Sequence, residues 1–282
     1  MALGREQVQW NDTVWNTLDA AVHDEFHRSA VALKFIPFHG QLANAMTVPA
    51  DVIDLDSMTV DEAGVSALVE LGIDFGLTRQ QTAAEEQNET GVTLATRSAN
   101  MLALAEDLAI FMGDGAFKNP LFKRVRKRSG NAGTGLFGSA AETVTVNAVA
   151  AGPPKRYGEA TFAAVADAYA RLQKRGHYGP YALALRTEIY ADTFAPLANT
   201  LVMPADRIRA LVELGLFGTG ALPESTGVMV SVGGNSMDLV VGTEPTTEFL
   251  QQDPDGYYRF RVFERFALRV KDSSAIVALK FE

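Results

Sequence analysis

The stretch FRVFERFALRV (Phe260–Val270) decides the fold, together with AIVALKF (Ala275–Phe281), which follows it. Both runs are rich in β-branched and aromatic residues, a composition typical of strands that pack against a core. Two upstream runs, YALAL (Tyr181–Leu185) and GVMVSVGGNSMDLVV (Gly227–Val241), have the same character. The whole region Arg175–Phe281 holds one histidine and no cysteine. These segments are suited to pairing and packing rather than to catalysis.

A second strand signal follows an acidic, turn-rich segment from Thr47 to Gly64. From Val65 to Leu77 every second residue is apolar, which predicts a strand with one buried side. Such a strand would reach ~40 Å at ~3.3 Å per residue. Its length fits either an arm that lies across another subunit or a long hairpin within one compact domain.

Helical spacing of apolar residues predicts several helices between these strands. The first begins at a capping residue, Asn11 or Asp12, and continues to about Ala30. Pro37 then favours an extended segment at Leu33–Gly40. The other predicted helices are Gly91–Met112, Tyr157–Arg175, Thr187–Asn199 and Ala205–Leu214. A chain that interleaves helices with long strands and ends in antiparallel strands belongs to the α+β class.

The composition narrows the range of functions. The 282 residues are 47% hydrophobic and 21% charged, close to globular averages. The net charge of −9 argues against nucleic acid as a partner. The absence of cysteine excludes disulfides and thiolate chemistry and fits a reducing compartment. We find neither a secretory signal nor an apolar run long enough for a membrane, and we therefore expect a soluble cytoplasmic protein.

The sequence Gly133-Thr134-Gly135-Leu136-Phe137-Gly138 matches the glycine pattern of dinucleotide sites. Such a site needs a buried strand before the glycines and a helix after them. Here a charged, turn-like segment precedes them, and the alternation at Val144 and Val146 predicts a strand after them. We therefore interpret GTGLFG as a glycine-rich loop and expect no nicotinamide cofactor.

The remaining polar clusters also have plain structural interpretations. His23 and His27 share a helix face but lack the third ligand that a metal site needs. The adjacent pairs Glu85-Glu86 and Glu106-Asp107 diverge on a helix, and we expect the second pair to make subunit contacts or to bond backbone groups. The basic run Lys123–Arg128 could bind phosphates or an acidic protein, or could be a solvated loop.

The order of these segments resembles that of encapsulin shell proteins, the linocin-like family of bacterial nanocompartments. The features that carry the resemblance are collinear: AEDLAIFMGD (Ala105–Asp114), HYGPYALAL (His177–Leu185), a helix ending in Gly215, GVMVS followed by MDLVVG, and RVFERFALRV closing on AIVALKF. The resemblance implies the fold of tailed-phage major capsid proteins, with a long spine helix. It implies four regions: an N-terminal helix and arm (1–46), an extended loop (47–78), a peripheral domain (79–115 and 224–282) and an axial domain (116–223).

The resemblance also implies a function without catalysis. Such a chain would assemble with itself, as 60 subunits or a larger icosahedral multiple, into a shell in the bacterial cytoplasm. The shell would enclose a cargo enzyme with a targeting peptide, ferritin-like or peroxidase-like. By position, the peptide would dock on Phe26, Leu33, Ile36, Phe38, Thr246 and Phe249. A mobile pore loop would comprise Leu216, Phe217, Gly218, Thr219, Gly220 and Ala221.

Some encapsulins bind flavin through an exposed aromatic residue. The matching segment Leu77–Gln80 has no Trp or Tyr, and we expect no cofactor and no metal. Two alternatives remain at this point. One is a phage or prophage major capsid protein of the same fold, and the other is a nicotinamide-dependent enzyme that uses the GTGLFG loop.

Overall fold

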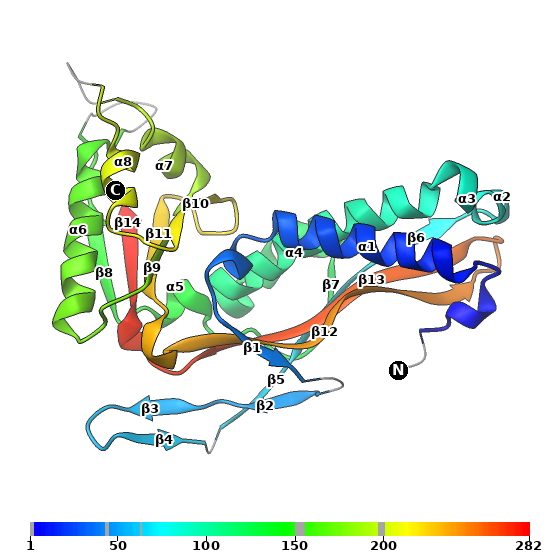
Figure 1. Ribbon diagram of the computed structural model, residues 1–282, viewed down its shortest axis with the longest axis horizontal. Coiled ribbons are helices and arrows are strands. Elements are labelled where there is room, and N and C mark those ends of the chain that lie inside the picture. Colours follow the sequence, from blue (N-terminus) through cyan, green and yellow to red (C-terminus); the bar gives the residue numbers. More distant parts are fainter. Residues whose placement is uncertain (1–2, 43–44, 63, 150–155, 197–200) are drawn as a thin grey trace.

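The structure, a computed structural model, describes residues 3–42, 45–62, 64–149, 156–196 and 201–282. Figure 1 shows an elongated part, in which two long helices lie over one sheet, and an upright part, in which a helix stands against a second sheet. Helices and mixed sheets alternate along the chain, which confirms the α+β prediction.

Helix α1 (Asp12–Ser29) begins where the sequence predicts. The Asn11 side chain accepts a hydrogen bond from the Val14 backbone N–H at 3.0 Å, which satisfies one of the free donors at the helix N-terminus. The stripe that includes Leu18, Val22 and Phe26 is buried against helix α4 and strand β12. The apolar spacing therefore marks the face that packs onto the body.

Helix α4 (Thr90–Met112) is the long central helix and would span ~35 Å at 1.5 Å per residue. The Glu85 carboxylate accepts hydrogen bonds from the backbone N–H groups of Gly91 (2.7 Å) and Val92 (2.9 Å) at its N-terminus. A negative charge stabilises this end of a helix. Gly113 ends the helix with a φ of 61°, a conformation that favours glycine. The predicted helix and its terminator are confirmed.

The first sheet has five strands and lies beneath α1 and α4 (Figure 1). Its order is β1 (Phe38–Gln41), β12 (Met237–Gln252), β13 (Tyr258–Val270), β6 (Val69–Leu77) and β7 (Arg126–Ser129). Strand β1 is parallel to β12, and the other neighbours are antiparallel. Strand β13 is therefore central, as its nearly continuous apolar sequence suggests.

The second sheet also has five strands. Its order is β10 (Gly215–Thr219), β9 (Tyr181–Arg186), β11 (Thr226–Ser231), β14 (Ile276–Phe281) and β8 (Glu142–Val146). Helix α6 (Glu159–Lys174) confirms the helix predicted at Tyr157–Arg175 and packs beside this sheet with α8 (Pro204–Arg209). The chain crosses between the two sheets. Strands β11 and β14 come from the range predicted as peripheral, yet they belong to the second sheet. Strand β7, from the range predicted as axial, joins the first sheet.

Two predicted helices are shorter in the structure. Helix α7 (Thr187–Asp192) ends well before Asn199, and residues 197–200 lie outside the described residues. Helix α8 ends at Arg209 rather than at Leu214, because a turn leads directly into β10. The remaining short helices are α2 (Arg79–Ala83), α3 (Glu85–Asn88), α5 (Gly135–Ser139), η1 (Arg5–Gln7), η2 (Ala32–Lys34), η3 (Gly113–Lys118), η4 (Pro120–Lys123), η5 (Gly233–Asn235) and η6 (Ser273–Ala275).

A narrow arm of paired strands projects below the first sheet (Figure 1). We define the arm as residues 47–67, with β2 (Thr47–Pro49) paired to β5 (Val65–Ala67) and a hairpin of β3 (Val52–Asp54) and β4 (Thr59–Asp61). The prediction of one continuous strand from Val65 to Leu77 is wrong. The strand breaks at Leu68, whose backbone N–H donates to Met46 at 3.0 Å, and β6 then enters the sheet.

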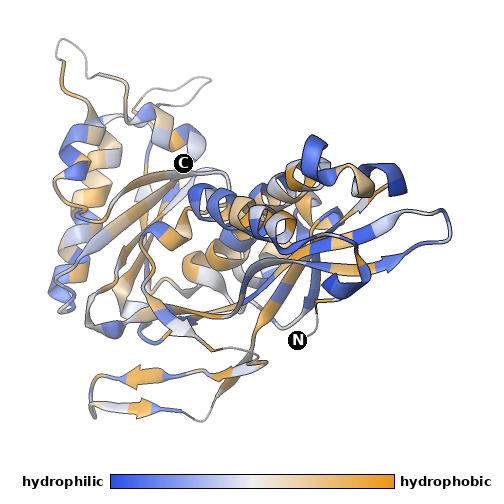
Figure 2. Cartoon of the chain, turned by 45° about the vertical axis from the view of Figure 1, so that its right-hand side comes forward, coloured by the Kyte–Doolittle hydropathy of each residue, from blue (hydrophilic) through white to orange (hydrophobic). Residues whose placement is uncertain are grey.

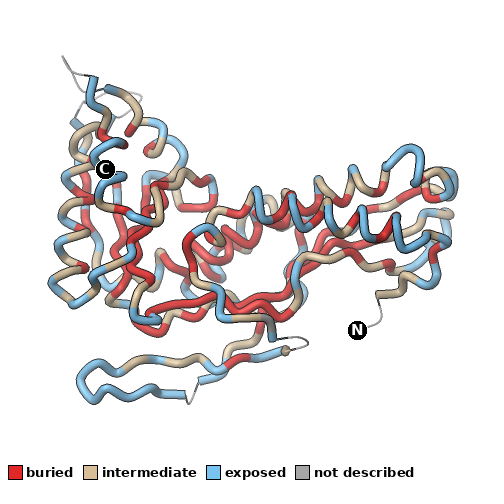
Figure 3. The backbone as a smooth tube through the Cα atoms, in the orientation of Figure 1, coloured by how far each residue is buried: buried red, intermediate tan, exposed pale blue. Residues whose placement is uncertain are grey.

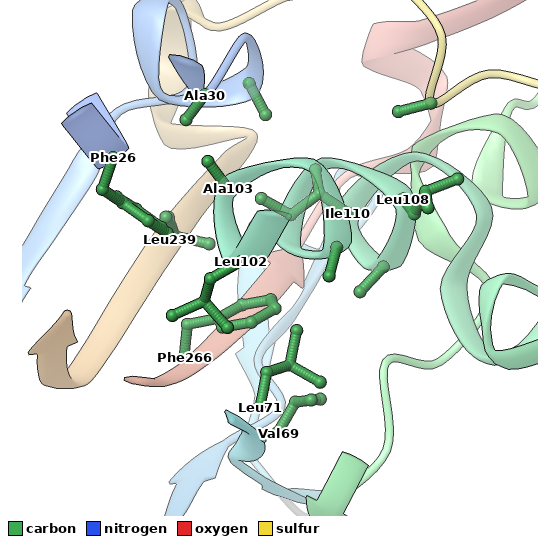
Figure 4. Packing of buried hydrophobic residues seen from close by; sticks show 14 of the residues in the cluster. Phe26, Ala30, Val69, Leu71, Leu102, Ala103, Leu108, Ile110, Leu239 and Phe266 are labelled. Carbon is green, nitrogen blue, oxygen red and sulfur yellow. The ribbon is translucent and has the colours of Figure 1, made fainter. Parts of the chain in front are cut away.

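The larger cluster of buried residues includes the side chains between α4 and the first sheet. Figure 4 shows Leu102 of α4 close to Phe266 of β13, with Leu71 and Val69 of β6 nearby. A second cluster fills the space between α6 and the second sheet. In Figure 3 the arm is mostly exposed, although Figure 2 shows hydrophobic residues along its hairpin. The arm therefore exposes apolar side chains that the single chain leaves uncovered.

Candidate functional site

Three of the six predicted docking residues lie in the core. Phe26 is 1% exposed, Ile36 5% and Phe249 6%. The Phe249 ring packs edge-on against Phe260, with 5.5 Å between the ring centroids. Phe26 is buried because the apolar stripe of α1 faces the body, and Ile36 and Phe249 belong to the same buried cluster. In the single chain they belong to the core rather than to an open groove, and the docking role that the resemblance implies for them stays a prediction.

The other three predicted docking residues retain exposed surface, but they do not form one cluster. Phe38 is 55% exposed on β1, which is an edge strand of the first sheet, and Leu33 is partly buried nearby in η2. Thr246 lies farther along β12, where its hydroxyl oxygen accepts a hydrogen bond from Arg5. Leu42, just beyond β1, is also exposed.

The predicted pore loop is not a loop. Its first four residues belong to β10, which pairs in parallel with β9. Leu216, Thr219 and Ala221 are buried, and the Phe217 ring stacks on Phe35 with 5.4 Å between their centroids. Gly220 is the exposed member of the six. The glycine-rich composition predicted a mobile loop. In the structure, pairing with β9 and the stacking of Phe217 on Phe35 hold this segment in the sheet.

In GTGLFG, Gly135 allows close backbone packing against the end of α4. Gly113, at the end of α4, lies so close to the loop that an added Cβ would be 2.2 Å from the Gly133 carbonyl oxygen. The Asp114 backbone N–H donates to that oxygen at 2.9 Å, and Gly135 approaches Gly113 equally closely. The strand before the loop, β7, is an exposed edge strand, and β8 follows as predicted. The glycine pattern therefore has a structural explanation.

The histidine pair lies on the surface of α1. The His23 and His27 rings lie 4.2 Å apart on exposed helix surface. Within the described ranges no group of three or more His, Cys, Asp or Glu residues is arranged to hold a metal ion. None of the described helices combines the length and hydrophobicity that spanning a membrane would require.

An unusual cluster of carboxyl groups lies in the core beneath α4. Glu106 and Asp107 of α4 and Glu264 of β13 are each at most 2% exposed. Asp107 accepts hydrogen bonds from the backbone N–H groups of Val31 and Ala32 at 2.8–3.1 Å, so the prediction that the pair makes subunit contacts or bonds backbone groups is confirmed for Asp107 in its second form. One carboxyl oxygen of Glu106 and one of Glu264 have no hydrogen-bond partner among the described residues.

Burial raises the pKa values of all three carboxyl groups. It raises the pKa of Asp107 to about 7, against the effect of its two backbone donors and Lys34. Burial, followed by the negative charge of Asp107, raises the pKa of Glu106 well above its usual value. The pKa of Glu264 is raised by burial and then by Glu106 and Asp107. Sequence reasoning missed Glu264, although its position among Phe260, Val262 and Phe266 on one strand face was a readable signal.

The comparison with known families identifies the chain. The sequence pattern of the family described as "Encapsulating protein for peroxidase" matches residues 1–120 and 134–267. This chain belongs to that family. It is therefore an encapsulin shell protein, and its role is structural. Residues 121–133 lie outside the matched ranges, and they include the basic run Lys123–Arg128.

Individual relatives agree with the family match. The shell protein is 33% identical over 119 residues to the type 1 encapsulin shell protein of Myxococcus xanthus, and this match spans 42% of the chain and 41% of that relative. Its structure is similar to the virus-like particle from Pyrococcus furiosus, with 17% identity and a TM-score of 0.66 over 94% of this chain and 99% of that one.

The capsid of a Myoviridae phage shares the fold at 12% identity, with a TM-score of 0.56 over 88% of this chain and 90% of that one. The shell protein thus has the tailed-phage capsid fold with a long central helix, as the resemblance implied. The phage similarity shows the fold alone, whereas the family match favours an encapsulin over a phage capsid protein.

Proposed function

We propose that the shell protein assembles into a closed icosahedral particle of 60 copies, or a larger multiple, in the bacterial cytoplasm. The match to a shell-forming family along most of the chain carries this proposal. The arm supports it, because exposed apolar side chains such as Met58 (80%) and Val65 (69%) need cover from another molecule. Closed symmetry provides that cover for every copy.

Purified protein should elute as a large uniform particle. Sixty chains of 30.4 kDa would give a mass of about 1.8 MDa, and a larger icosahedral particle a multiple of it. Size-exclusion chromatography with light scattering measures this mass directly. A stable monomer or dimer at micromolar concentration would contradict the proposal.

We infer further that the particle encloses an enzyme, and that this enzyme is a peroxidase carrying a targeting peptide. The description of the family supports a peroxidase, and a ferritin-like cargo is the second candidate. The test is co-expression with a dye-decolourising peroxidase with and without its terminal peptide. Peroxidase activity should co-elute with the particles when the peptide is present and should be absent from them when it is removed.

The docking surface that we propose is the edge of β1, with Phe38, Leu33 and Leu42 as apolar contacts and Thr246 at its margin. An edge strand offers unpaired backbone groups to an extended peptide, and exposed side chains add specificity. Phe26, Ile36 and Phe249 are core residues and are not part of this proposed surface.

Replacing Phe38 with Ala should lower the cargo per particle without lowering thermal stability. Loss of an aromatic anchor typically costs ~2 kcal/mol, or roughly thirtyfold in affinity. Ile36→Ala is the matched control, because Ile36 is buried and its truncation should cost ~2–5 kcal/mol of folding stability instead. Cargo per particle and melting temperature are measured for both. Unchanged loading in Phe38→Ala particles would rule out this docking surface.

The division into regions is part of the same proposal. We assign the arm to the extended loop, the first sheet with α1 and α4 to the peripheral domain, and the second sheet with α6 to the axial domain. Residues 216–221 remain our prediction for the border of a fivefold opening, to which the exposed Gly220 would contribute most. Electron microscopy of the particle would locate both features.

A further inference from the structure

The positive charge of this chain is concentrated in one segment. Residues 115–141 contain no Asp or Glu but six basic residues, namely Lys118, Lys123, Arg124, Arg126, Lys127 and Arg128. The segment therefore has a charge of +6, and taking it from the net charge of −9 leaves −15 for the rest of the chain. Such a separation of charge is typical of proteins that bind an anionic polymer at one place.

The structure places all six basic side chains on the surface. They are exposed, and we call the surface that they form the basic surface. Three of them belong to β7, an edge strand of the first sheet, and the other three lie in or directly after the short helices η3 and η4. Charge on an edge strand discourages pairing with another strand. That role accounts for β7, but it does not require the three cations that precede it.

Acids of the same chain neutralise little of this charge. Lys127 reaches Asp114 at 3.5 Å, and Arg128 reaches Asp74 only at 4.0 Å. Both acids already hold other donors, because Asp74 accepts from Arg261 at 2.7 Å and Asp114 from a backbone N–H at 3.0 Å. The remaining four cations form no ion pair within the described part of the chain. They are therefore available to anions of another molecule.

The basic surface lacks the apolar contacts that a protein or a membrane would use. The structure describes all of residues 115–141, and none of their large hydrophobic side chains is exposed. Phe117 and Phe122 are partly buried and pack edge-on against each other, with 4.9 Å between the ring centroids. Protein interfaces have an apolar centre, and helices that lie on membranes have an apolar face. The surface therefore favours a partner that is recognised by charge.

The arrangement of the arginines suits phosphate groups. A guanidinium group is planar and donates paired hydrogen bonds to phosphate oxygens. Arg126 and Arg128 line the same hollow with Arg261, so they share one side of β7. Residues two apart on a strand are separated by ~6.7 Å. Phosphates of one nucleic acid strand follow one another at ~3.4 Å along the helix axis, so the two arginines match every second phosphate.

We propose that the basic surface binds a chain of phosphates, such as the backbone of a nucleic acid, without reading its sequence. No exposed aromatic side chain lies among the six cations, so the bases have nothing on which to stack. The negative charge of the rest of the chain confines binding to this surface. The inference goes beyond the shell function. It concerns a segment that includes residues 121–133, which lie outside the family match.

Binding is measured by the fluorescence anisotropy of a labelled oligothymidylate. It is added to purified chains dissociated from particles and is followed again after reassembly, so that both faces of a shell are tested. Each phosphate contact contributes about −0.7 to the slope of log affinity against log salt for a single strand. With four unpaired cations, the affinity should fall roughly fiftyfold between about 50 mM and 200 mM salt.

Neutralising part of the basic surface should weaken binding without affecting the fold. The variant combines Lys118→Gln, Lys123→Gln and Arg124→Gln. All three side chains are exposed and unpaired, so the melting temperature should stay that of the wild type. The affinity for the oligonucleotide should fall at least ~tenfold at about 50 mM salt, and the salt slope should drop to about a quarter.

The matched control removes the same charge elsewhere. It combines Arg97→Gln on α4, Lys174→Gln on α6 and Arg209→Gln on α8, all at exposed positions. The control should bind the oligonucleotide like the wild type. Equal losses in the two variants would show that only the total charge matters, and would overturn the site.

Competition experiments identify the ligand. Displacement of the oligonucleotide by inorganic polyphosphate supports recognition of any phosphate chain, and displacement by unlabelled nucleic acid alone assigns the surface to nucleic acid. Equal displacement by polyglutamate overturns phosphate recognition in favour of an acidic protein. Failure of the wild-type chain to bind the oligonucleotide at about 50 mM salt overturns the inference altogether. Particle mass is measured separately, so none of these results affects the shell proposal.

Discussion

Replacing Val69 with Asp is expected to unfold the chain. Val69 is 1% exposed on β6, directly opposite Phe266 of β13, and Figure 4 shows both in the cluster beneath α4. A carboxylate at this position would have no partner, and burying an unpaired charge costs several kcal/mol or forces the group to stay protonated. Typical domains have only ~5–15 kcal/mol of stability in total. We expect no cooperative melting transition and little protein in the soluble fraction.

The matched control is Val60→Asp, on the arm. Val60 is 53% exposed, so the same substitution should change the free energy of unfolding by at most ~0.5 kcal/mol. The folded chain should persist, and particle formation should be the property that is lost. This pair of variants separates folding from assembly. A Val69→Asp chain that melts like the wild type would show that β6 does not belong to the core.

Stability should fall as the pH rises through neutrality, because of the carboxyl cluster beneath α4. Glu106, Asp107 and Glu264 have pKa values that burial raises in the folded chain. A raised pKa means that the folded state holds a proton which the unfolded state releases. The stabilisation is therefore complete below the unfolded pKa of ~4 and is lost as the pH rises through the folded pKa.

We call the pH range over which this stabilisation is lost the window. For Asp107 the window ends near pH 7, because its folded pKa is about 7. For the two glutamates it begins near the ordinary pKa of glutamate and extends to their raised pKa values. Within the window each group lowers the free energy of unfolding by ~1.4 kcal/mol per pH unit. Urea unfolding between pH 5 and pH 9 should show this decline. The other charged group that acts on the cluster is Lys34, which favours ionised Asp107.

Glu264→Gln should make the chain more stable at alkaline pH. Glutamine has nearly the same shape and cannot ionise. Removing this negative charge also lowers the pKa of Glu106. We expect a gain of ~1.4 kcal/mol or more at pH 9 and little change at pH 5. Glu86→Gln, at an exposed position, should leave the pH profile as it is. If the free energy of unfolding falls with pH equally steeply in the wild type and in Glu264→Gln, this account is contradicted.

Local features of the sequence were enough to predict much of the fold. The caps and apolar spacing of α1, α4 and α6 depend on neighbours three or four residues away, and their predicted bounds agree with the structure to within a few residues. The strand character of Phe260–Val270 followed from its composition. The collinear order of the strand runs was also enough to indicate the encapsulin family, which the family match then showed.

Tertiary structure decided what those elements contact. The alternation from Val65 to Leu77 is the same on both sides of Leu68, yet one part joins the arm and the other the core sheet. An alternation of apolar and polar residues shows which side of a strand is apolar, but it does not show which neighbouring element covers that side. Phe26 and Phe38 are both aromatic, and only the packing of α1 against α4 makes one buried and the other exposed. Likewise, Arg126 and Arg128 line one pocket with Arg259 and Arg261 only because β7, distant in sequence from β13, belongs to the same sheet.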